Sequence, residues 1–388
     1  MTRFLLLLLA AVQAVLGARV LLRLARTANG QRIEPASDPR PAGETVSILV
    51  PVLNEVRRLV PCLDGLVGQG TEVVEILVVD GGSTDGTQDL ARGYAARDRR
   101  VRLLDAAPVP PGINGKAYGL AFGAAAMAET AWVLTIDADV RPAPGLVRAL
   151  LAHADQTGVP ALSAATLQEV SGAAEGLLHP AMLTTLVYRF GIPGRATKRV
   201  AEVQANGQCF LVKRETLARS GGFAGVATSV CEDVTLARAI AAGGDPVGFH
   251  ETTGLVSVAM YAGWRDAWQN WTRSLPTRDR FWGATGWFGL AEVLLVQALP
   301  LPLAIGLRGP RHPTGRALWA LNAGLAATRI GVLAGTARAY RRRPWTYWLS
   351  PALDLPVAIR LIRSATKRRH TWRGRELVRA DAPLPGNE

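Results

Sequence analysis

Two carboxylates follow directly on an apolar run in AWVLTIDAD, residues 131–139. Buried strands do not end in two acids without a partner for the charge. In an extended backbone, residues i and i+2 point the same way, so Asp137 and Asp139 can face one ion. Carboxylate oxygens suit Mg2+ or Mn2+, which in turn bind substrate phosphates. An Asp-x-Asp triplet also arises by chance about once in such a chain, so its place at a strand end is the stronger signal.

A further acid ends another apolar run, in LVVDGGSTDGT, residues 77–87. Asp80 closes a stretch typical of a buried strand, and a loop rich in Gly, Ser, Thr and Asp follows it. Such a loop lets the backbone approach a nucleotide, while Asp80 can accept hydrogen bonds from a base or sugar. A plain turn, in which Asp85 caps a helix that begins near Thr87, is the alternative, but it leaves Asp80 unexplained.

Two more stretches place polar residues just after apolar or glycine-containing segments. SILVPVLNE, residues 47–55, runs from a strand-like segment into Pro51 and Glu55, although Pro also ends strands and Asn-Glu also starts helices. In PPGINGKAYGL, residues 110–120, Lys116 lies at the expected start of a helix, where it can meet a diphosphate. An isolated surface lysine is the commoner outcome for such a residue.

These residues depend on the elements around them for their positions. Residues 45–53, 74–80 and 131–139 are rich in Val, Ile and Leu, as expected of strands buried on both faces. Residues 87–98 and 116–129 have helical composition, so strands and helices alternate and predict an α/β domain with a mainly parallel sheet. Ligands of such sheets bind at the carboxyl ends of the strands, which is where the three aspartates fall.

The ordered set PVLNE, VVDGGSTDGT, PPGINGKAYGL and TIDAD resembles the catalytic domain of the family 2 glycosyltransferases, which use nucleotide-activated sugars. NGQCFLVKRETLARSGGF, residues 206–223, is similar to a later stretch of that family, and CEDVTLARAI, residues 231–240, to its Glu-Asp motif. The resemblance covers residues 46–280. It implies a GT-A type nucleotide-diphospho-sugar transferase fold and a metal-dependent hexosyltransferase with Mg2+ or Mn2+ as cofactor.

The resemblance also implies roles for individual residues. Asp137 and Asp139 would face the diphosphate, with Asp139 as the more direct metal ligand. Asp233, next to Glu232 in the Glu-Asp motif, would be the catalytic base that deprotonates an acceptor hydroxyl, and the sugar would be transferred with inversion. The alternatives are an ordinary ion pair of Glu232 with an arginine and helix capping by Asp233. Contacts to the donor would come from Pro51, Glu55, Asp80, Lys116, Asp137 and Gln208.

The stretch after the proposed base departs from the family pattern. Many membrane-bound relatives carry Gln-x-x-Arg-Trp, whereas residues 267–279 read AWQNWTRSLPTRD. Gln269 is present, but Arg273 lies one place further on, and Trp271 precedes it. Gln269, Trp271 and Arg273 are candidate contacts to the substrate. Trp268, Trp271 and Arg273 are predicted to close over the diphosphate, and an amphipathic helix that contacts the membrane is the alternative. The departure argues against a synthase that extends a polysaccharide.

The composition favours a soluble domain joined to membrane segments, because 49% of the 388 residues are hydrophobic and 19% are charged. The apolar run at residues 4–22 is interpreted as an uncleaved membrane anchor, with a signal peptide as the alternative. Residues 283–307 and 317–340 are further candidate spans, the second weakened by Arg329. Residues 344–362 contain three prolines and an aspartate and are predicted not to cross.

The formal net charge of +13 is concentrated next to the apolar segments. This pattern follows the positive-inside rule and predicts a multi-pass protein of the inner membrane whose catalytic domain faces the cytoplasm. The chain contains no nucleic-acid-binding motif, so no nucleic-acid partner is expected. The predicted divisions are an anchor (1–26), a linker (27–44), the catalytic domain (45–281), membrane segments (282–364) and a basic cytosolic tail (365–388).

A transferase domain tied to the membrane at both ends suggests an acceptor within the bilayer. The stretch MYAGWRDAWQNWTRSLPTRD, the closing apolar segments and HTWRGRELV most resemble carotenoid, hopanoid and ceramide-type lipid glycosyltransferases. The expected partners are therefore a nucleotide-sugar donor, a membrane lipid acceptor, with a carotenoid or related isoprenoid favoured, and the bilayer itself. Two alternatives stay open: an enzyme that glycosylates a polyprenyl phosphate, and a non-catalytic scaffold in a lipid-synthesis complex.

Overall fold

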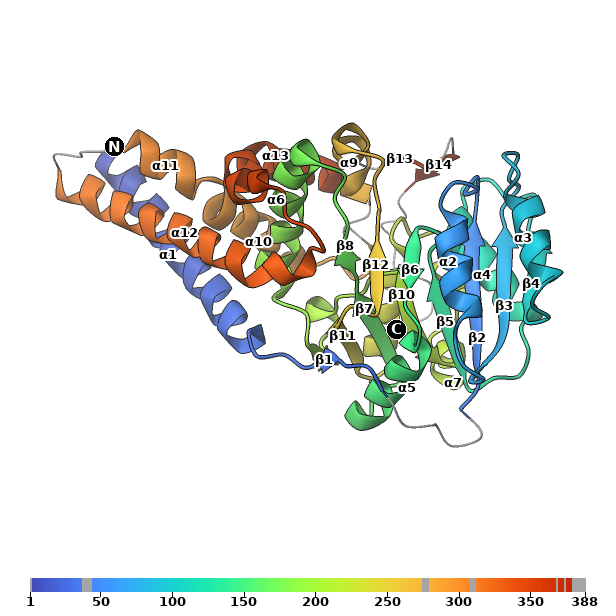
Figure 1. The fold of residues 1–388 in the computed structure, drawn as a ribbon. Coiled ribbons are helices and arrows are strands. Elements are labelled where there is room, and N and C mark those ends of the chain that lie inside the picture. Colours follow the sequence, from blue (N-terminus) through green and yellow to red (C-terminus); the bar gives the residue numbers. More distant parts are fainter. Residues whose placement is uncertain are drawn as a thin grey trace.

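The structure is a computed structural model of the chain. It describes residues 2–36, 44–273, 279–307, 312–367, 369–372 and 375–378, without the side chains of residues 2, 273, 370–372 and 375–378. A sheet flanked by helices forms one end of the molecule, and a group of long helices extends away from it (Figure 1).

The main sheet has the strand order β1-β11-β7-β10-β5-β2-β3-β4, with β9 paired to β11. All neighbours are parallel except at β10 and β9, which run antiparallel to the strands beside them. This confirms the prediction of a mainly parallel sheet. The strands are β1 (Arg32–Ile33), β2 (Val46–Val52), β3 (Val73–Asp80), β4 (Val101–Asp105), β5 (Trp132–Ile136), β7 (Ala161–Ala165), β9 (Arg195–Thr197), β10 (Cys209–Lys213) and β11 (Val247–Thr252).

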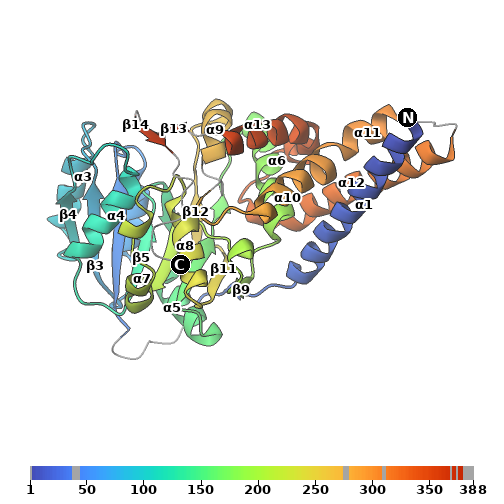
Figure 2. The same cartoon turned by 180° about the vertical axis from the view of Figure 1, so that it is seen from behind.

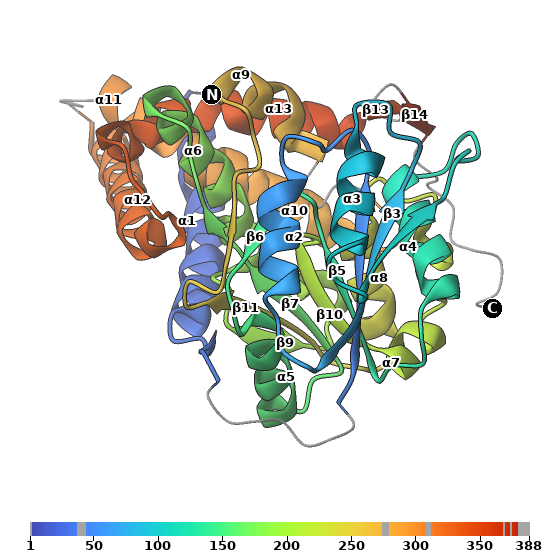
Figure 3. The ribbon, with the colours of Figure 1, turned by 45° about the vertical axis from the view of Figure 1, so that its right-hand side comes forward.

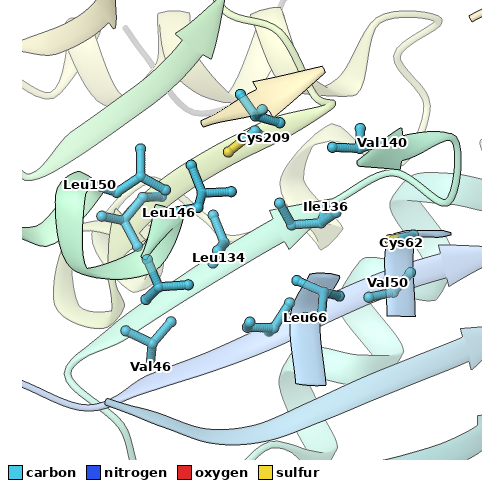
Figure 4. Packing of buried hydrophobic residues seen from close by; sticks show 14 of the residues in the cluster. Val46, Val50, Cys62, Leu66, Leu134, Ile136, Val140, Leu146, Leu150 and Cys209 are labelled. Carbon is cyan, nitrogen blue, oxygen red and sulfur yellow. The ribbon is translucent and has the colours of Figure 1, made fainter. Parts of the chain in front are cut away.

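Helices cover both faces of this sheet, as Figures 1 and 2 show from opposite sides. One apolar core joins the strands to α2 (Leu59–Val67), α3 (Thr87–Ala95) and α5 (Leu146–Thr157). Figure 4 shows part of it, with Leu66 of α2 and Leu146 of α5 near the buried strand residues Val50 and Leu134. A second core on the opposite face involves α4 (Gly115–Ala126), α7 (Arg214–Arg219) and α8 (Glu232–Ala242). Burial on both faces explains the unbroken runs of Val, Ile and Leu in the central strands.

A small second sheet in the order β6-β12-β8 lies beside the carboxyl end of β5. Its strands are β6 (Val140–Pro142), β8 (Leu167–Gln168) and β12 (Val256–Val258). Because β6 begins directly after Asp139, pairing with β12 fixes the direction in which the chain leaves the Asp-Ala-Asp triplet.

Three helices are long and apolar enough to span a membrane: residues 3–27, 284–306 and 313–339. They comprise α1 (Thr2–Thr27), α10 (Ala284–Glu292) with a π-helical turn (Val293–Ala298) and α11 (Pro300–Gly306), and α12 (Pro313–Thr336). The N-terminal end of α1, the end of α11 and the start of α12 lie at the end farthest from the sheet (Figure 1). The catalytic part therefore caps one end of the group.

Two further helices fill the junction between the sheet and the candidate spans (Figure 3). These are α6 (Ala173–Phe190), which lies within the predicted catalytic domain, and α9 (Trp264–Asn270). Buried residues of α6 pack with α1 and α12 in one cluster and with α9 and the closing helix α13 (Asp354–Thr366) in another. The catalytic domain is thus joined to the helices through a continuous apolar contact.

Several charged residues of the candidate spans form ion pairs. Glu292 of α10 accepts from Arg19 at 3.0 Å and from Arg23 at 2.8 Å, both in α1. Arg329 of α12, which weakened the prediction of a span, is buried and donates to Asp354 at 2.8 Å. Such pairing lowers the cost of placing charge in an apolar environment.

Two of the predicted divisions contain regular structure that the sequence did not predict. The expected linker contributes β1, which pairs with β11 and buries Ile33 completely, because an apolar residue at the open edge of a sheet gains from joining it. The tail carries a hairpin of β13 (Arg369–Trp372) and β14 (Arg375–Val378). Residues 345–366 form a 3-10 helix (Trp345–Leu353) followed by α13, so neither is among the helices long enough to span, in agreement with the expectation that 344–362 does not cross.

Candidate active site

A cavity of about 650 Å³ lies where the carboxyl ends of β2 and β5 meet the start of β10. This is the edge of the sheet at which the sequence predicted a ligand. The lining brings together most of the predicted residues from five different parts of the chain. It includes Pro51, Glu55, Lys116, Asp137, Asp139, Gln208, Glu232 and Asp233.

Lys116 joins the two acidic motifs across this cavity. It lies in the first turn of α4, and its Nζ is 2.6 Å from Asp137 Oδ1 and 3.1 Å from Glu232 Oε1. Burial opposes the charge of Lys116, but Asp137, Glu232 and Asp233 together raise its pKa above the ordinary value. Glu232 therefore pairs with Lys116. The alternative, an ion pair of Glu232 with an arginine, is not found among the described residues.

Asn114 was not among the predicted residues, yet it holds the same junction together. Its carboxamide oxygen accepts from the backbone N–H of Lys116 at 2.9 Å, which caps α4. Its amide group donates to Glu232 Oε2 at 3.0 Å and to the carbonyl of Ser229 at 2.9 Å. An Asn directly before a helical stretch was the signal that could have identified it as a cap, but nothing local showed its contact with Glu232.

Asp139 faces the cavity from the loop after β5, near a second residue that the sequence had not singled out. Arg58, at the start of α2, lies 2.8 Å from Glu55 Oε2 and 3.8 Å from Asp139 Oδ2. The other carboxylate oxygen of Asp139 is buried and has no hydrogen-bond partner among the described residues. Burial, and then the charge of Asp137, raise the pKa of Asp139 to about 7.

Asp233 lies in the first turn of α8, where the backbone supports its carboxylate. Its Oδ2 accepts from the N–H of Gly207 at 2.6 Å, and its Oδ1 from its neighbour Val234 at 2.8 Å. Burial, followed by the charge of Glu232, raises the pKa of Asp233 to about 6, while Lys116 opposes the shift. The N-cap of α8 is Cys231, so Asp233 does not have the capping position that was its alternative. A carboxylate with this pKa can accept a proton near neutral pH.

The residues present fit a divalent cation. Asp137 is paired with Lys116, whereas Asp139 presents a buried oxygen that has no partner among the side chains and backbone that the structure describes. No group of three or more His, Cys, Asp or Glu side chains gathers as a metal site in the described part of the chain. One or two carboxylates, completed by water and substrate phosphates, is the donor set expected for Mg2+ or Mn2+ in a nucleotide site.

Asp80 does not line the cavity. It is fully buried at the end of β3 and accepts from the backbone of Gly82 and Ser83 at 3.1 and 2.9 Å and from Gln88 at 2.7 Å. Its carboxylate is occupied in shaping its own loop, so a direct contact with the nucleotide stays a prediction. Asp85 accepts from the N–H of Thr87 at 3.0 Å, where α3 begins, although the N-cap residue of α3 is Gly86 and not Asp85.

The residues of the divergent Gln-x-x-Arg-Trp stretch do not lie together at the donor cavity. The side chain of Gln269 is exposed and does not line the cavity, because Asp266 and Asn270 of the same helix take the facing positions. Trp271 is 1% exposed and packs in the apolar cluster with α6 and α13. The side chain of Arg273 lies outside the described residues. The structure therefore does not bring Gln269 and Trp271 to the donor cavity.

A second cavity, of about 350 Å³, adjoins the first between the sheet and α6. Its lining is largely apolar and includes Met182, Leu186, Val187 and Trp271. The two cavities share lining residues, among them Asp233 and Gln208. Asp233 thus lines both the acidic donor cavity and the apolar cavity.

Comparison with known proteins agrees with this arrangement. Residues 47–218 match the family described as Glycosyl transferase family 2. A glycosyltransferase of Streptococcus pneumoniae, GlyG, is 36% identical over 61 residues, or 16% of this chain and 20% of that protein. EpsJ, an uncharacterized glycosyltransferase of Bacillus subtilis, is 37% identical over 59 residues, or 15% of this chain and 17% of that protein. The chain therefore matches about a fifth of the length of these relatives.

The whole fold is similar to a solved structure, the mannosyltransferase PcManGT from Pyrobaculum calidifontis in complex with GDP-Man and Mn2+. The likeness covers 93% of this chain and 99% of that chain, with a TM-score of 0.51 and 19% sequence identity. The fold is therefore of the GT-A type, as the sequence predicted, and residues 47–218 match the model of glycosyltransferase family 2.

Proposed function

We propose that this protein is an inverting hexosyltransferase that transfers a sugar from a nucleotide-diphosphate-sugar to a hydroxyl group of a membrane lipid. An isoprenoid such as a carotenoid is the favoured acceptor. The observation that carries the proposal is the position of Asp233, which lines both the acidic cavity and the apolar one. A base placed between a polar and an apolar chamber suits a reaction between a water-soluble donor and a lipid hydroxyl.

The residues of the acidic cavity would perform distinct parts of the transfer. Asp233 would accept the proton of the acceptor hydroxyl while its oxygen forms a bond to the anomeric carbon. The bond between that carbon and the diphosphate oxygen would break on the opposite face, which inverts the configuration. A divalent cation held by Asp139, with Asp137, would supply positive charge to the leaving diphosphate. Lys116 would hold Asp137 and Glu232 in place and add positive charge nearby.

The electrostatics of the cavity support a need for such a cation. Its lining holds six carboxylates and two basic side chains, Lys116 and Arg58. A diphosphate brought into this surplus of negative charge would be repelled unless a cation came with it. The bound GDP-Man and Mn2+ of the structurally similar mannosyltransferase are in keeping with this requirement.

The placement of the acceptor follows from the three candidate spans. We propose that α1, the α10–α11 segment and α12 cross the inner membrane and that the catalytic domain faces the cytoplasm. Because two spans lie between the catalytic domain and the C-terminal tail, the domain and the tail lie on the same side. The apolar cavity against α6 would then lie next to the bilayer, and its lining reaches Thr336 at the end of α12.

Sugar transfer in isolated membranes tests the proposal. Radiolabelled UDP-glucose, UDP-galactose and GDP-mannose are supplied with Mg2+ or Mn2+ and a lipid extract. The native chain is compared with Asp233→Asn and with Asp89→Asn, a matched control whose carboxylate is exposed on α3. Label is expected in an organic-soluble product with the native chain and the control, and on the order of 100-fold less with Asp233→Asn.

The product distinguishes the remaining alternatives. Lability of its sugar to mild acid would indicate a polyprenyl phosphate acceptor, whereas a stable glycoside of an isoprenoid alcohol supports the proposal. Equal label with Asp233→Asn would remove Asp233 as the base. Absence of both transfer and calorimetric donor binding with every donor in the panel would favour the non-catalytic scaffold.

A further inference from the structure

A third cavity, of about 520 Å³, lies at the junction between the catalytic domain and the candidate spans. It shares no lining residue with the donor cavity. Its polar lining is dominated by one residue type, with seven arginines and two glutamates. These are Arg19, Arg23, Arg26, Arg189, Arg195, Arg199 and Arg238, with Glu202 and Glu292.

The elements around this arginine-lined cavity place it at the expected surface of the membrane. Arg26 lies in the last turn of α1, and the candidate span ends at Thr27. The opposite wall is formed by residues 281–289, where the span that begins at Ala284 starts. Strand β9 and helix α8 of the catalytic domain close the third side. Charged headgroups of lipids are found at this level of a bilayer.

The positive charge of the cavity exceeds the negative charge that the protein provides there. Glu292 is bound by Arg19 and Arg23, Glu202 lies 3.2 Å from Arg199, and Asp279 lies 2.7 Å from Arg238. In the part of the chain that the structure describes, three carboxylates thus pair with four of the arginines, namely Arg19, Arg23, Arg199 and Arg238.

Individual arginines show where this excess charge lies. Arg26 and Arg195 are exposed and have no ion-pair partner among the residues that the structure describes. Arg189 is buried, and its burial, followed by the nearby charge of Arg238, lowers its pKa to about 9. An anion in the cavity would relieve this repulsion.

The same cavity has an apolar side. Leu22 of α1 lines it and is 57% exposed, although it belongs to a candidate span. Phe190, Phe281 and Trp282 also contribute to the wall. Aromatic side chains combined with arginine are typical of the boundary between headgroups and acyl chains. A ligand that is anionic at one end and apolar at the other matches both parts of the wall.

We propose that this cavity binds the phosphate headgroup of an anionic membrane lipid, whose acyl chain lies along Leu22. The bound lipid would seat the catalytic domain on the bilayer by linking α1 to β9 and α8. The cavity shares Ile192, Pro193, Gln204 and Phe249 with the apolar cavity but no lining residue with the donor cavity, so we assign the bound lipid a structural role and not that of the acceptor. The proposal is independent of the reaction that the donor site catalyses.

Lipid binding to the purified full-length protein tests the proposal. Native mass spectrometry from detergent micelles measures retention of dioleoylphosphatidylglycerol by the native chain and by the double variant Arg26→Gln, Arg195→Gln. Both residues are exposed, so the fold is expected to survive, and the thermal midpoint checks this. Arg92→Gln with Arg99→Gln, two exposed arginines on and after α3, is the matched loss of charge elsewhere.

The expected result is a loss of phosphatidylglycerol affinity by about tenfold or more in the cavity variant and none in the control. Dioleoylphosphatidylcholine, which carries no net charge, is expected to bind more weakly and equally to all three proteins. Equal loss in the control, or none in either variant, would overturn the proposal. Displacement of the lipid by inorganic phosphate at low millimolar concentration would also overturn it, because the site would then serve a free anion.

Discussion

At the scale of single residues, the position of Lys116 determines which carboxylates of the site are already paired with a positive charge of the protein. It binds Asp137 from the end of β5 and Glu232 from the start of α8. Asp137 is therefore already neutralised, whereas Asp139 keeps a buried oxygen without a partner among the described residues. This difference supports Asp139 as the principal metal ligand, which the Asp-x-Asp pattern alone could not have distinguished from Asp137.

The state of Asp233 predicts the pH dependence of transfer. Its pKa is raised to about 6, by burial and then by Glu232, so the ionised base is lost as the pH falls through about 6 and not near 4. We expect kcat/KM to rise about tenfold per pH unit below this value and to level off above it. Initial rates between pH 4.5 and 8 measure this, and calorimetry of donor binding over the same range separates binding from chemistry. A flat profile would contradict the role of Asp233.

Gly207 is a second point at which a single atom matters. A Cβ added to this residue would lie 2.6 Å from Lys116 Nζ and 3.0 Å from Asp233 Oδ2. We expect Gly207→Ala to reduce transfer by at least about tenfold, because it displaces both side chains, while the thermal midpoint changes little. Gly93→Ala is the control, since a Cβ there meets nothing within 4 Å. Native activity in Gly207→Ala would show that the two side chains adjust freely.

At the scale of elements, the contact between α2 and β6 positions the Asp-Ala-Asp triplet. Gly65 of α2 lies so close to Pro142 that an added Cβ would be 2.2 Å from the carbonyl oxygen of that residue. On the neighbouring turn of α2, the thiol of Cys62 lies 3.6 Å from the carbonyl oxygen of Asp137. The helix thus packs directly on the segment that carries both carboxylates.

Gly65→Ala tests this contact. Helix propensity alone predicts stabilisation by about 1 kcal/mol, because Ala replaces Gly inside a helix. The collision with a backbone carbonyl is expected to outweigh this gain, with a loss of about 1–3 kcal/mol and weaker donor binding. Thermal unfolding and calorimetric titration with the donor and Mn2+ measure the two effects. Increased stability with unchanged donor affinity would show that α2 does not hold the triplet.

At the scale of the whole molecule, buried polar pairs hold the helices together where they leave the catalytic domain. Arg329 and Asp354 are 2% and 1% exposed and are joined by two hydrogen bonds, at 2.8 and 3.0 Å. Gln297 of the preceding segment donates to the same carboxylate at 2.9 Å. The closing helix α13 is therefore tied to α12 and to the π-helical turn by one aspartate.

A double-mutant cycle on this pair follows from its burial. Asp354→Leu alone is expected to destabilise the protein by about 3–5 kcal/mol, because it leaves Arg329 charged and buried. Adding Arg329→Met removes the uncompensated charge and is expected to restore most of that stability. Thermal unfolding in one detergent or nanodisc preparation gives the coupling energy. If the double variant is no more stable than Asp354→Leu, the loss of stability does not come from the uncompensated charge of Arg329. It would then come from altered packing at position 354.

Much of the fold was predictable because the signals are local. Unbroken Val, Ile and Leu runs marked β2, β3 and β5, and the order of the short motifs indicated the GT-A type before any contact was known. The edge strand β1 was missed because a strand of two residues is too short to show the alternation of polar and apolar side chains. Gln269 was predicted to contact the donor, but its exposed side chain does not line the donor cavity. A motif alone does not indicate which face of α9 is directed toward that cavity.

The sequence by itself determined the acids, their order along the chain and the strands that end in them, because strand periodicity and loop composition are properties of neighbouring residues. Tertiary structure alone decided which groups meet. Asn114 contacts Glu232 across 118 positions, and Asp80 turns into its own loop and away from the cavity. The apolar cavity beside Asp233 and the arginine-lined cavity also arise between elements far apart in the chain. Their existence depends on how helices pack on the sheet, which no local pattern encodes.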